Sequence, residues 1–310
     1  MDDKIPLLVI VGPTASGKTS LAIDLALALD GEIISADSMQ IYTGMDIATA
    51  KPSLEEMRGV PHHLIDFVPP DGCFSVAQYA PLAHAAIQDI YTRRKLPILC
   101  GGTGLYIQAV AENLALTEGE LTHDAAGTWQ QLHEIDPAYA AKIHPNDNKR
   151  VSHALALYRA TGVTLTEQNL RSRQNPSPYD ARMIFFNARD RQHLYDRIDR
   201  RVDQMLASGL LAEAENQRPA SPAEPQRARD TAAQAIGYKE LEPYFLGQCP
   251  LDEAIESLKR ETRRFAKRQL SWFRRMAREW NERSPGSCVE FFIEDDDLLE
   301  HAIEYARRPS

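Results

Sequence analysis

Residues 12–19, GPTASGKT, are of the types that bind a chain of phosphates. The segment matches G-x-x-x-x-G-K-[ST] at every position, and it follows an apolar run and opens a stretch of helical spacing, as the motif requires. The glycines let the backbone wrap closely around phosphate, so that N–H groups and a helix N-terminus face its oxygens. The residues expected to hold a pyrophosphate-containing ligand are Gly12, Thr14, Ala15, Ser16, Gly17, Lys18 and Thr19.

Two of these side chains have more specific expected roles. Lys18 supplies a full positive charge, and the Thr19 hydroxyl is the expected ligand of a Mg²⁺ cofactor. A P-loop ATPase usually carries a carboxylate after a later strand, but the strand expected at residues 96–100 runs into Gly101-Gly102-Thr103 without an acid. The sequence therefore argues against a motor or a switch.

An acid does follow an earlier strand. Asp37 ends the apolar run 32–36, at the edge where parallel α/β sheets bind ligands, and a carboxylate there can take a proton from an incoming nucleophile. The alternative is that Asp37 N-caps the next turn. Thr103 offers a similar choice, because its hydroxyl can donate to a leaving group or cap the helix that follows.

Three arginines lie close together in the segment DRIDRRVD. A guanidinium group can bind two pyrophosphate oxygens at once, and Arg197 and Arg201 share one helix face, with Arg200 beside them. The alternative is that these arginines pair along a solvated surface with acidic neighbours, which are Asp196, Asp199 and Asp203.

The charge is unevenly distributed. The whole chain has a net charge of −9, yet residues 259–278 contain nine Lys or Arg and a single acid, Glu261. A phosphate backbone responds to the local field rather than to the total, so this segment can bind nucleic acid. Basic residues beside Trp272-Phe273 fit that use, and Lys267, Arg268 and Gln269 are expected to contact it; the alternatives are core packing for the rings and a solvated helix face for the charges.

The bulk composition is that of a globular protein. The 310 residues are 43% hydrophobic and 25% charged, and four scattered cysteines lack the close spacing of a zinc or redox site. The N-terminal apolar run is too short for a signal peptide, and no stretch reaches the ~20 apolar residues that span a bilayer. We expect a cytoplasmic protein with reduced thiols and no membrane contact, and a monomer, since no interface is indicated.

The order of elements predicts an α/β fold. Strands are expected at residues 5–11, 32–36, 63–67 and 96–100, and helices at 18–29, 75–94 and from 104 onward. This alternation predicts a P-loop NTPase-like parallel sheet flanked by helices.

The pattern changes after this region. Residues 117–180 show helical segments, of which 147–161 is the clearest, and no convincing strand. A strand is expected again at 183–187, followed by a helix at 194–211, a proline-rich surface loop at 217–230 and a long helix at 251–283. The prediction is a core of residues 1–116 and 181–310, with a helical insertion domain at 117–180.

Nine ordered motifs resemble one family, the tRNA dimethylallyltransferases, or tRNA isopentenyltransferases. The resemblance covers nearly the whole chain. The motifs, with the number of the first residue of each, are GPTASGKT (12), DSMQIY (37), MDIATAKP (45), PHHLID (61), GGTGLY (101), NDNKRV (146) with the following ALALYRATG, LYDRIDRRVDQML (194), AIGYKE (235) and TRRFAKRQLSWFR (262).

The resemblance implies transfer of a dimethylallyl group from its diphosphate to N6 of the adenosine just 3′ of the anticodon. The P-loop would then hold a prenyl diphosphate rather than ATP. Asp37 matches the general base, Thr103 the residue at the bridging oxygen, and Arg201 an arginine that binds diphosphate. The reacting adenosine would be flipped into a channel.

The tRNA partner, through its anticodon stem-loop, would be contacted by stretches matching those of the family. These residues are Asp37, Ser38, Met39, Gln40, Thr103, Lys149, Arg150, Val151, Ser152, His153, Gln234, Ala235, Ile236, Gly237, Tyr238 and Lys239. The sequence departs from the family pattern at Ala48, where Gly is common, and at His153, where Arg is common.

Three other functions are compatible with parts of the sequence. A P-loop small-molecule kinase would use Asp37 as base but leave the basic C-terminal helix without a role. An adenylate prenyltransferase would need neither the helical insertion nor residues 262–274. An RNA-binding ATPase would need a water-polarising acid, which the sequence does not show.

Overall fold

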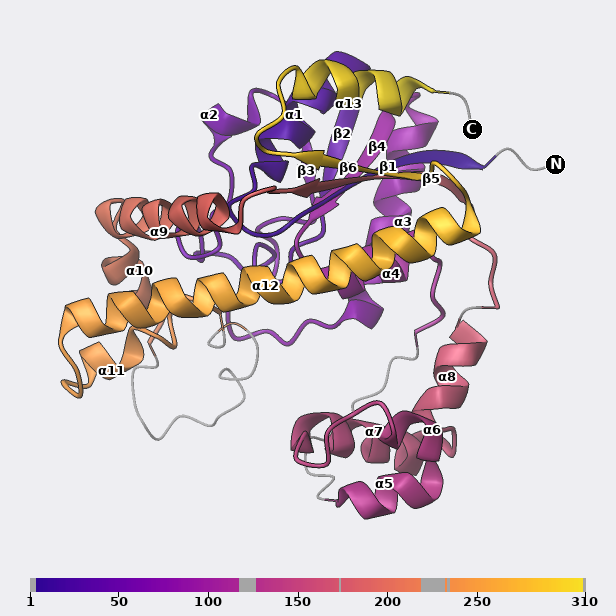
Figure 1. Ribbon diagram of the computed structural model, residues 1–310, viewed down its shortest axis with the longest axis vertical. Coiled ribbons are helices and arrows are strands. Elements are labelled where there is room, and N and C mark those ends of the chain that lie inside the picture. Colours follow the sequence, from indigo (N-terminus) through magenta and orange to yellow (C-terminus); the bar gives the residue numbers. More distant parts are fainter. Residues whose placement is uncertain (1–3, 117–126, 173, 219–231, 233–234, 309–310) are drawn as a thin grey trace.

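The computed structural model describes residues 4–116, 127–172, 174–218, 232 and 235–308, and Figure 1 shows its architecture. The predicted stretches around residues 117–126 and 219–231, and Gln234, lie outside the described residues. The centre of the molecule is a six-stranded parallel sheet in the order β3-β2-β4-β1-β5-β6. Its strands are β1 (Ile5–Val11), β2 (Gly31–Ser35), β3 (His62–His63), β4 (Leu96–Gly101), β5 (Tyr179–Asn187) and β6 (Cys288–Phe292).

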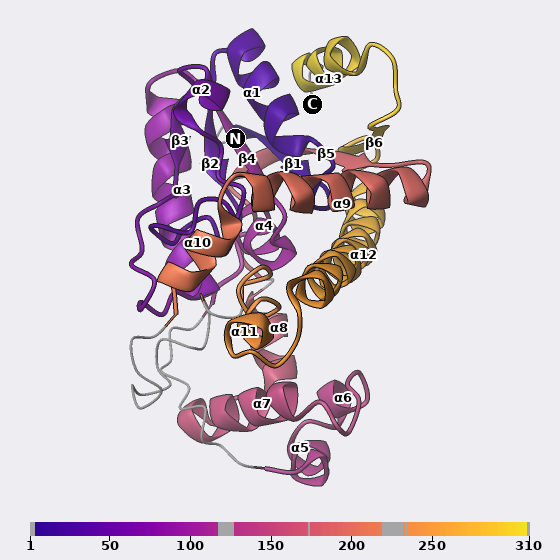
Figure 2. The ribbon, with the colours of Figure 1, turned by 90° about the vertical axis from the view of Figure 1, so that its left-hand side faces the viewer.

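Helices cover both faces of this sheet (Figure 2). On one face lie α1 (Lys18–Leu29) and α13 (Leu298–Arg307), and on the other α3 (Val76–Thr92), α4 (Gly104–Ala111) and α12 (Leu251–Arg283). The side chains of β1 alternate between the two cores, because successive residues of a strand point to opposite faces. This burial on both sides explains the continuous apolar run of β1, as predicted for a central parallel strand.

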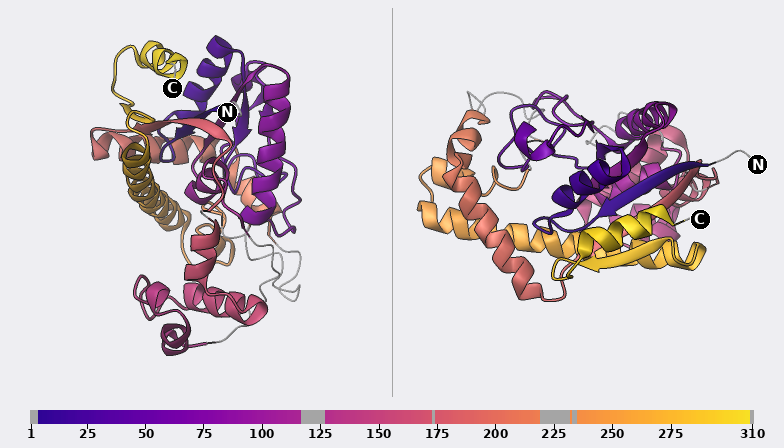
Figure 3. Two further views of the ribbon diagram at one scale, coloured as in Figure 1. Left: turned by 90° about the vertical axis from the view of Figure 1, so that its right-hand side faces the viewer. Right: turned by 90° about the horizontal axis from the view of Figure 1, so that it is seen from above.

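The helical insertion forms a small unit of its own. Its helices are α5 (Trp129–Ile135), α6 (Pro137–Ala140), α7 (Asn148–Thr161) and α8 (Leu165–Ser172). They enclose a separate apolar core around Leu132, Val151 and Leu155. In Figure 1 and in the left view of Figure 3 this unit lies apart from the sheet. The sheet resumes with β5 at Tyr179, which pairs with Ile5, slightly before the expected boundary at residue 181.

A third group of elements packs beside the carboxyl edge of the sheet. It consists of the chain around residues 39–48, α9 (Arg191–Ala207), α10 (Leu210–Asn216), α11 (Glu242–Phe245) and the start of α12, and α2 (Leu54–Met57) lies nearby. Tyr42, Met45, Leu210 and Leu241 are fully buried there. This apolar core beside the sheet holds the loops that surround the candidate site.

Most predicted elements agree with the structure, but two expectations are wrong and two elements were not predicted. The third strand is only His62–His63, because Leu64 and Asp66 have positive φ angles of 58° and turn the chain away from β2. The helix expected at residues 194–211 is two helices, broken at Gly209, whose φ of 102° is left-handed. The strand β6 and the helix α13 were not predicted.

In the part of the chain that the structure describes, no group of three or more His, Cys, Asp or Glu side chains is placed to hold a metal ion. All four cysteines are free thiols, of which Cys100 and Cys288 are buried. Among the described residues no helix combines the length and apolarity needed to cross a bilayer.

Glu32 forms a buried ion cluster inside β2. Its side chain accepts hydrogen bonds from both terminal nitrogens of Arg93, and His63 Nε2 lies 2.8 Å from Oε2. Only 2% of the residue is exposed. The hydrogen bonds from Arg93 lower the pKa of Glu32 from 4.5 to about 2, although burial acts in the opposite direction.

We expect Glu32→Gln to lower the free energy of unfolding at neutral pH by about 1–3 kcal/mol, because Arg93 loses its ionised partner. A carboxylate with a lowered folded-state pKa stabilises the fold above pH 4.5 and loses this effect as the pH falls toward about 2. The variant should therefore lose less stability in acid. Denaturant unfolding across this range checks it, with exposed Glu256→Gln as control; equal acid sensitivity of variant and wild type would contradict the assignment.

Candidate active site

Four neighbouring strands bring the predicted chemical residues to one edge of the sheet. In the order β2, β4, β1 and β5, they run into Asp37, Thr103, the P-loop with Lys18, and α9 with Arg201. Because all four strands are parallel, their carboxyl ends lie side by side. This is the crevice in which open α/β sheets bind ligands.

The P-loop has the backbone shape of an anion site. Ala15 and Gly17 have positive φ angles of 62° and 93°, and Gly17 caps α1 without any side-chain hydrogen bond. The first N–H groups of α1 therefore have no side-chain acceptor and face the concave side of the loop. The Ser16 hydroxyl is buried and has no hydrogen-bond partner among the described residues. A bound phosphate would satisfy such groups.

Lys18, Asp37 and Arg201 lie within range of one another's charge. Burial lowers the pKa of Lys18, the Asp37 carboxylate raises it, and the Arg201 guanidinium lowers it. Burial also lowers the pKa of Arg201, and Asp37 is the largest opposing charge. Two cations and one anion share this poorly hydrated space, so the site has an excess of positive charge that suits an anionic ligand.

Asp37 and Thr103 are linked through Ser38. Asp37 Oδ1 accepts the N–H of Met39 at 2.9 Å, so the carboxylate does cap a turn, and this bond fixes its orientation. Thr103 stands at the N-cap of α4, but its hydroxyl makes no cap; Oγ1 accepts Ser38 N–H at 2.9 Å and donates to Ser38 Oγ at 3.2 Å. The alternative of a turn cap therefore holds for Asp37, and the alternative of a helix cap fails for the Thr103 side chain.

The three arginines of α9 point to different places. Arg197 Nε donates to Ala15 O at 2.8 Å and braces the P-loop from outside. Arg200 is exposed, and its Nε donates to Asp196 O within its own helix. Arg201 is half-buried and lines a cavity of about 1050 Å³ together with Lys18 and Thr19. Of the three, Arg201 is therefore the one placed to meet a bound diphosphate.

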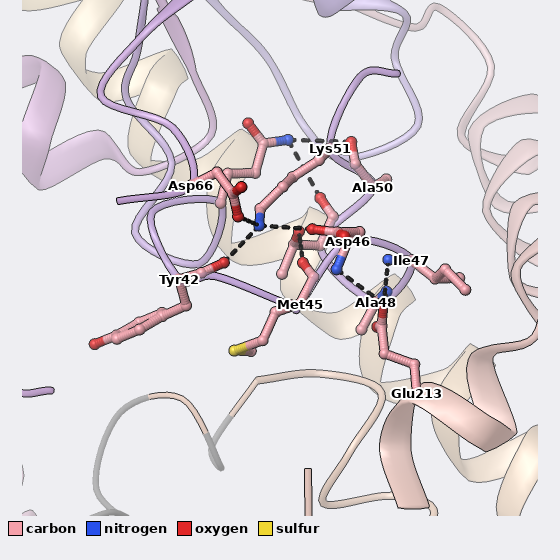
Figure 4. Close-up of polar contacts among 12 residues, drawn as sticks. Tyr42, Met45, Asp46, Ile47, Ala48, Ala50, Lys51, Asp66 and Glu213 are labelled. Atoms are coloured by element: carbon pink, nitrogen blue, oxygen red, sulfur yellow. Dashed lines mark hydrogen bonds and ion pairs between the residues drawn. The ribbon is translucent and has the colours of Figure 1, made fainter. Parts of the chain in front are cut away.

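The chain between Tyr42 and Lys51 forms another wall of this cavity. Hydrogen bonds from the buried ammonium group of Lys51 hold it in place (Figure 4). The Lys51 side chain is 7% exposed, and Nζ donates to Tyr42 O at 2.5 Å, to Asp46 Oδ1 at 2.7 Å and to Asp66 Oδ1. The Gln40 amide adds hydrogen bonds to two backbone carbonyls of the same turn.

Glu213, on α10, anchors the same wall from the other side. Its carboxylate accepts the backbone N–H groups of Asp46, Ile47 and Ala48 at 2.8, 2.7 and 2.9 Å, and the hydroxyl of Tyr238 at 2.9 Å. Ala48, which departs from the family pattern, faces Gly237, where an added Cβ would lie 3.2 Å away. Sequence reasoning did not single out Glu213, because its partners lie about 165 residues earlier.

The residues expected to contact tRNA divide into two groups. The first group reaches the surface. In it Lys149, Arg150, His153, Lys239, Lys267 and Arg268 are exposed, and Ser38, Met39, Gln40, Ser152 and Ile236 are half-buried. The second group is buried and consists of Val151, Ala235, Gly237, Tyr238 and Gln269. These five pack inside the protein, and the contact of their stretches with tRNA stays a prediction.

Some of the Lys and Arg side chains of α12 form ion pairs and others do not. Ion pairs connect Lys259 to Asp203, Arg263 to Asp199, and Arg264, Arg275 and Arg278 to glutamates of α12 itself. Among the described residues no ion pair involves Lys267, Arg268 or Arg274. Phe273 is in the core against Phe185, and Trp272 packs on Gly104, so the alternative of core packing applies to both rings. The net charge of residues 259–278 thus overstates the free positive surface.

Fold and geometry together define a P-loop α/β protein with Lys18, Arg201 and the Asp37 carboxylate at one edge of its sheet. Residues 40–276 match the model of the IPP transferase family. A tRNA dimethylallyltransferase of Thermoanaerobacter sp. (strain X514) is 46% identical, over 87% of this chain and 89% of the relative, and one of Caldanaerobacter subterraneus is 42% identical over 97% of both. The chain therefore belongs to the IPP transferase family.

Solved structures agree with this assignment. The full-length tRNA isopentenylpyrophosphate transferase of Bacillus halodurans is 42% identical, with a TM-score of 0.68 over 98% of this chain and 95% of that one. A eukaryotic dimethylallyltransferase, described as acting on tRNA, is 30% identical, with a TM-score of 0.82 over 96% of this chain and 77% of that one.

The Glu213 anchor can be tested by Glu213→Gln. The amide keeps one acceptor oxygen but turns an NH₂ group toward backbone N–H donors, so we expect a loss of about 1–3 kcal/mol in the free energy of unfolding. Hydrogen exchange of the amides of residues 46–48 should accelerate. Glu215→Gln, exposed on the same helix, is the matched control; equal exchange rates in both variants would show that Glu213 does not hold the turn.

Proposed function

We propose that the protein transfers a dimethylallyl group from dimethylallyl diphosphate to N6 of the adenosine immediately 3′ of the anticodon in tRNA. The observation that carries this proposal is the placement of Asp37 beside a diphosphate cradle made of the P-loop, Lys18, Thr103 and Arg201. Membership of the IPP transferase family, and relatives named as tRNA dimethylallyltransferases, support the same reaction.

The reaction exchanges one bond for another. The bond between C1 of the allyl group and the bridging oxygen breaks, and its electrons remain on diphosphate. The N6 lone pair of adenosine forms the new bond to C1, and Asp37 takes the proton that N6 releases. Asp37 suits this role because its other oxygen, Oδ2, accepts no hydrogen bond within the described part of the chain.

The rest of the site stabilises the leaving group. Negative charge grows on diphosphate as the C–O bond breaks, and the cations of Lys18 and Arg201 lie where desolvation strengthens their attraction. The P-loop N–H groups add fixed dipoles. Thr103 Oγ1 accepts the Ser38 N–H and donates its proton to Ser38 Oγ at 3.2 Å, so we propose that this proton turns from Ser38 to the bridging oxygen when the donor binds.

Mg²⁺ fits this arrangement as a cofactor. Thr19 opens α1 and lines the cavity, and Mg²⁺ commonly uses only one or two protein oxygens while phosphate and water complete its shell. We propose that Thr19 holds the ion against the diphosphate. When bound, it neutralises part of the charge on the leaving group.

We propose that tRNA binds along the surface that carries the unpaired cations of α12, with α7 and Lys239 contributing further charge. Lys267, Arg268 and Arg274 are exposed there, as are Lys149 and Arg150 on α7. Phosphate contacts of this kind give most of the affinity without reading sequence. The site is built from one chain, so we propose a monomer, acting on tRNA in the cytoplasm.

The test is transfer of label from dimethylallyl diphosphate to unmodified tRNA with adenosine just 3′ of its anticodon, beside an ATP control. Asp37→Asn should lower kcat by roughly 10²–10⁴-fold, the usual effect of losing a general base. The tRNA Kd should change by less than about twofold, because the amide keeps the turn-capping oxygen. Turnover of ATP with a small acceptor, and no labelled tRNA, would favour a kinase instead.

The basic surface predicts a salt dependence of tRNA binding. The double variant Lys267→Ala/Arg268→Ala should reduce the slope of log Kd against log salt by about one to two, in proportion to lost phosphate contacts. Arg278→Ala on the same helix is the control, because its guanidinium pairs with Glu282. If the double variant and the control showed the same slope as wild type, the unpaired cations would have no part in binding.

A further inference from the structure

The amide of Gln269 joins the two loops that form the diphosphate site. Oε1 accepts the backbone N–H of Thr14 in the P-loop at 2.8 Å, and Nε2 donates to the backbone carbonyl of Gly102 at 2.9 Å. The residue is 6% exposed although it lies on the long basic helix. Both ends of the amide are therefore used inside the protein, one on each side of the ligand cradle.

The packing around this amide is close. An added Cβ on Gly102 would lie 2.4 Å from Gln269 Nε2, and one on Gly104 would lie 2.3 Å from the Trp272 ring. The motif GGTG thus has glycines on both sides of Thr103 where α12 presses against the loop. Ala266, one turn before Gln269, packs with Ala15 of the P-loop, so α12 contacts both loops over one face.

We propose that Gln269 is a positioning residue for the prenyl diphosphate site, and that it does not contact tRNA. It sets the distance between the P-loop, which holds the diphosphate, and Thr103, which faces the bridging oxygen. A side-chain amide fits this role well, because one end must accept from an N–H group and the other must donate to a carbonyl. The inference rests on the transfer reaction proposed above.

Neighbouring residues on α12 therefore have different functions. Lys267 and Arg268 are exposed and serve tRNA, whereas Gln269 serves the allyl donor from the buried face. A direct tRNA contact by Gln269 would raise the KM for tRNA. A positioning role raises the KM for the donor and lowers kcat, because a displaced Thr103 no longer meets the leaving oxygen.

The first experiment measures kcat and both KM values for Gln269→Leu, which removes both hydrogen bonds at similar volume. We expect the donor KM to rise about tenfold, the size expected for two neutral hydrogen bonds, and the tRNA KM to stay within about twofold. Lys267→Ala should show the reverse pattern, and exposed Ser271→Ala should match wild type. Transfer by the wild type is measured first, so failure of the reaction is distinguished from failure of the Gln269 assignment.

A second variant changes the same contact on the side of Gly102. Gly102→Ala places a methyl group against the Gln269 amide and should also raise the donor KM. If the two residues act through one contact, the double variant Gly102→Ala/Gln269→Leu should be no worse than the more affected single variant. Independent, multiplying effects would overturn the proposal.

Two further outcomes would also overturn it. A rise in the tRNA KM alone would make Gln269 a tRNA contact, and a lower Tm with unchanged KM values and kcat per folded molecule would make it merely structural. Should Gln269→Leu fail to fold, Gln269→Glu keeps the acceptor for Thr14 and loses the donor to Gly102. A rise in the donor KM of Gln269→Glu at neutral pH would support the positioning role, and an unchanged donor KM would overturn it.

Discussion

The register of four parallel strands is the constraint on which the site depends. The strand β1 pairs on one side with β4 and on the other with β5, and β4 pairs with β2. Backbone hydrogen bonds fix these strands relative to one another, so the segments that leave their carboxyl ends cannot drift apart. Asp37, Thr103, Lys18 and Arg201 come from regions up to 183 residues apart in sequence, yet the sheet brings them to one edge.

The sheet places these segments but does not hold their fine geometry. Helices outside the sheet hold this fine geometry, each through a small number of buried polar contacts. Arg197 braces the P-loop from α9, Gln269 ties the P-loop to the loop before α4, and Glu213 fixes the turn at residues 46–48. Each contact satisfies backbone groups that would otherwise be buried without partners, so the same bonds that stabilise the fold also set the shape of the cavity.

Local signals explain what was predictable from the sequence. The helices Lys18–Leu29 and Leu251–Arg283 have the expected bounds, and Ser75 caps α3 through a capping box with Gln78. The P-loop and its place after a buried strand were equally clear. The break at Leu64 was missed because a leucine gives no sign of a left-handed φ, whereas the break at Gly209 was missed although glycine is the residue type that favours one. The roles of Glu213 and Gln269 depend on partners 165 and 255 residues away, which no local pattern reveals.

The charge pattern of α9 shows how such long-range contacts change the meaning of a motif. In DRIDRRVD the arginines and aspartates can be interpreted as pairs along one helix, yet Asp199 and Asp203 bind Arg263 and Lys259 of α12. The acids therefore face α12, and the arginines at 197 and 201 face the P-loop. It follows that the first half of the basic helix is a structural anchor for α9. Lys267, Arg268 and Arg274 have no ion-pair partner in the described part of the chain, which leaves their charges available to a polyanion.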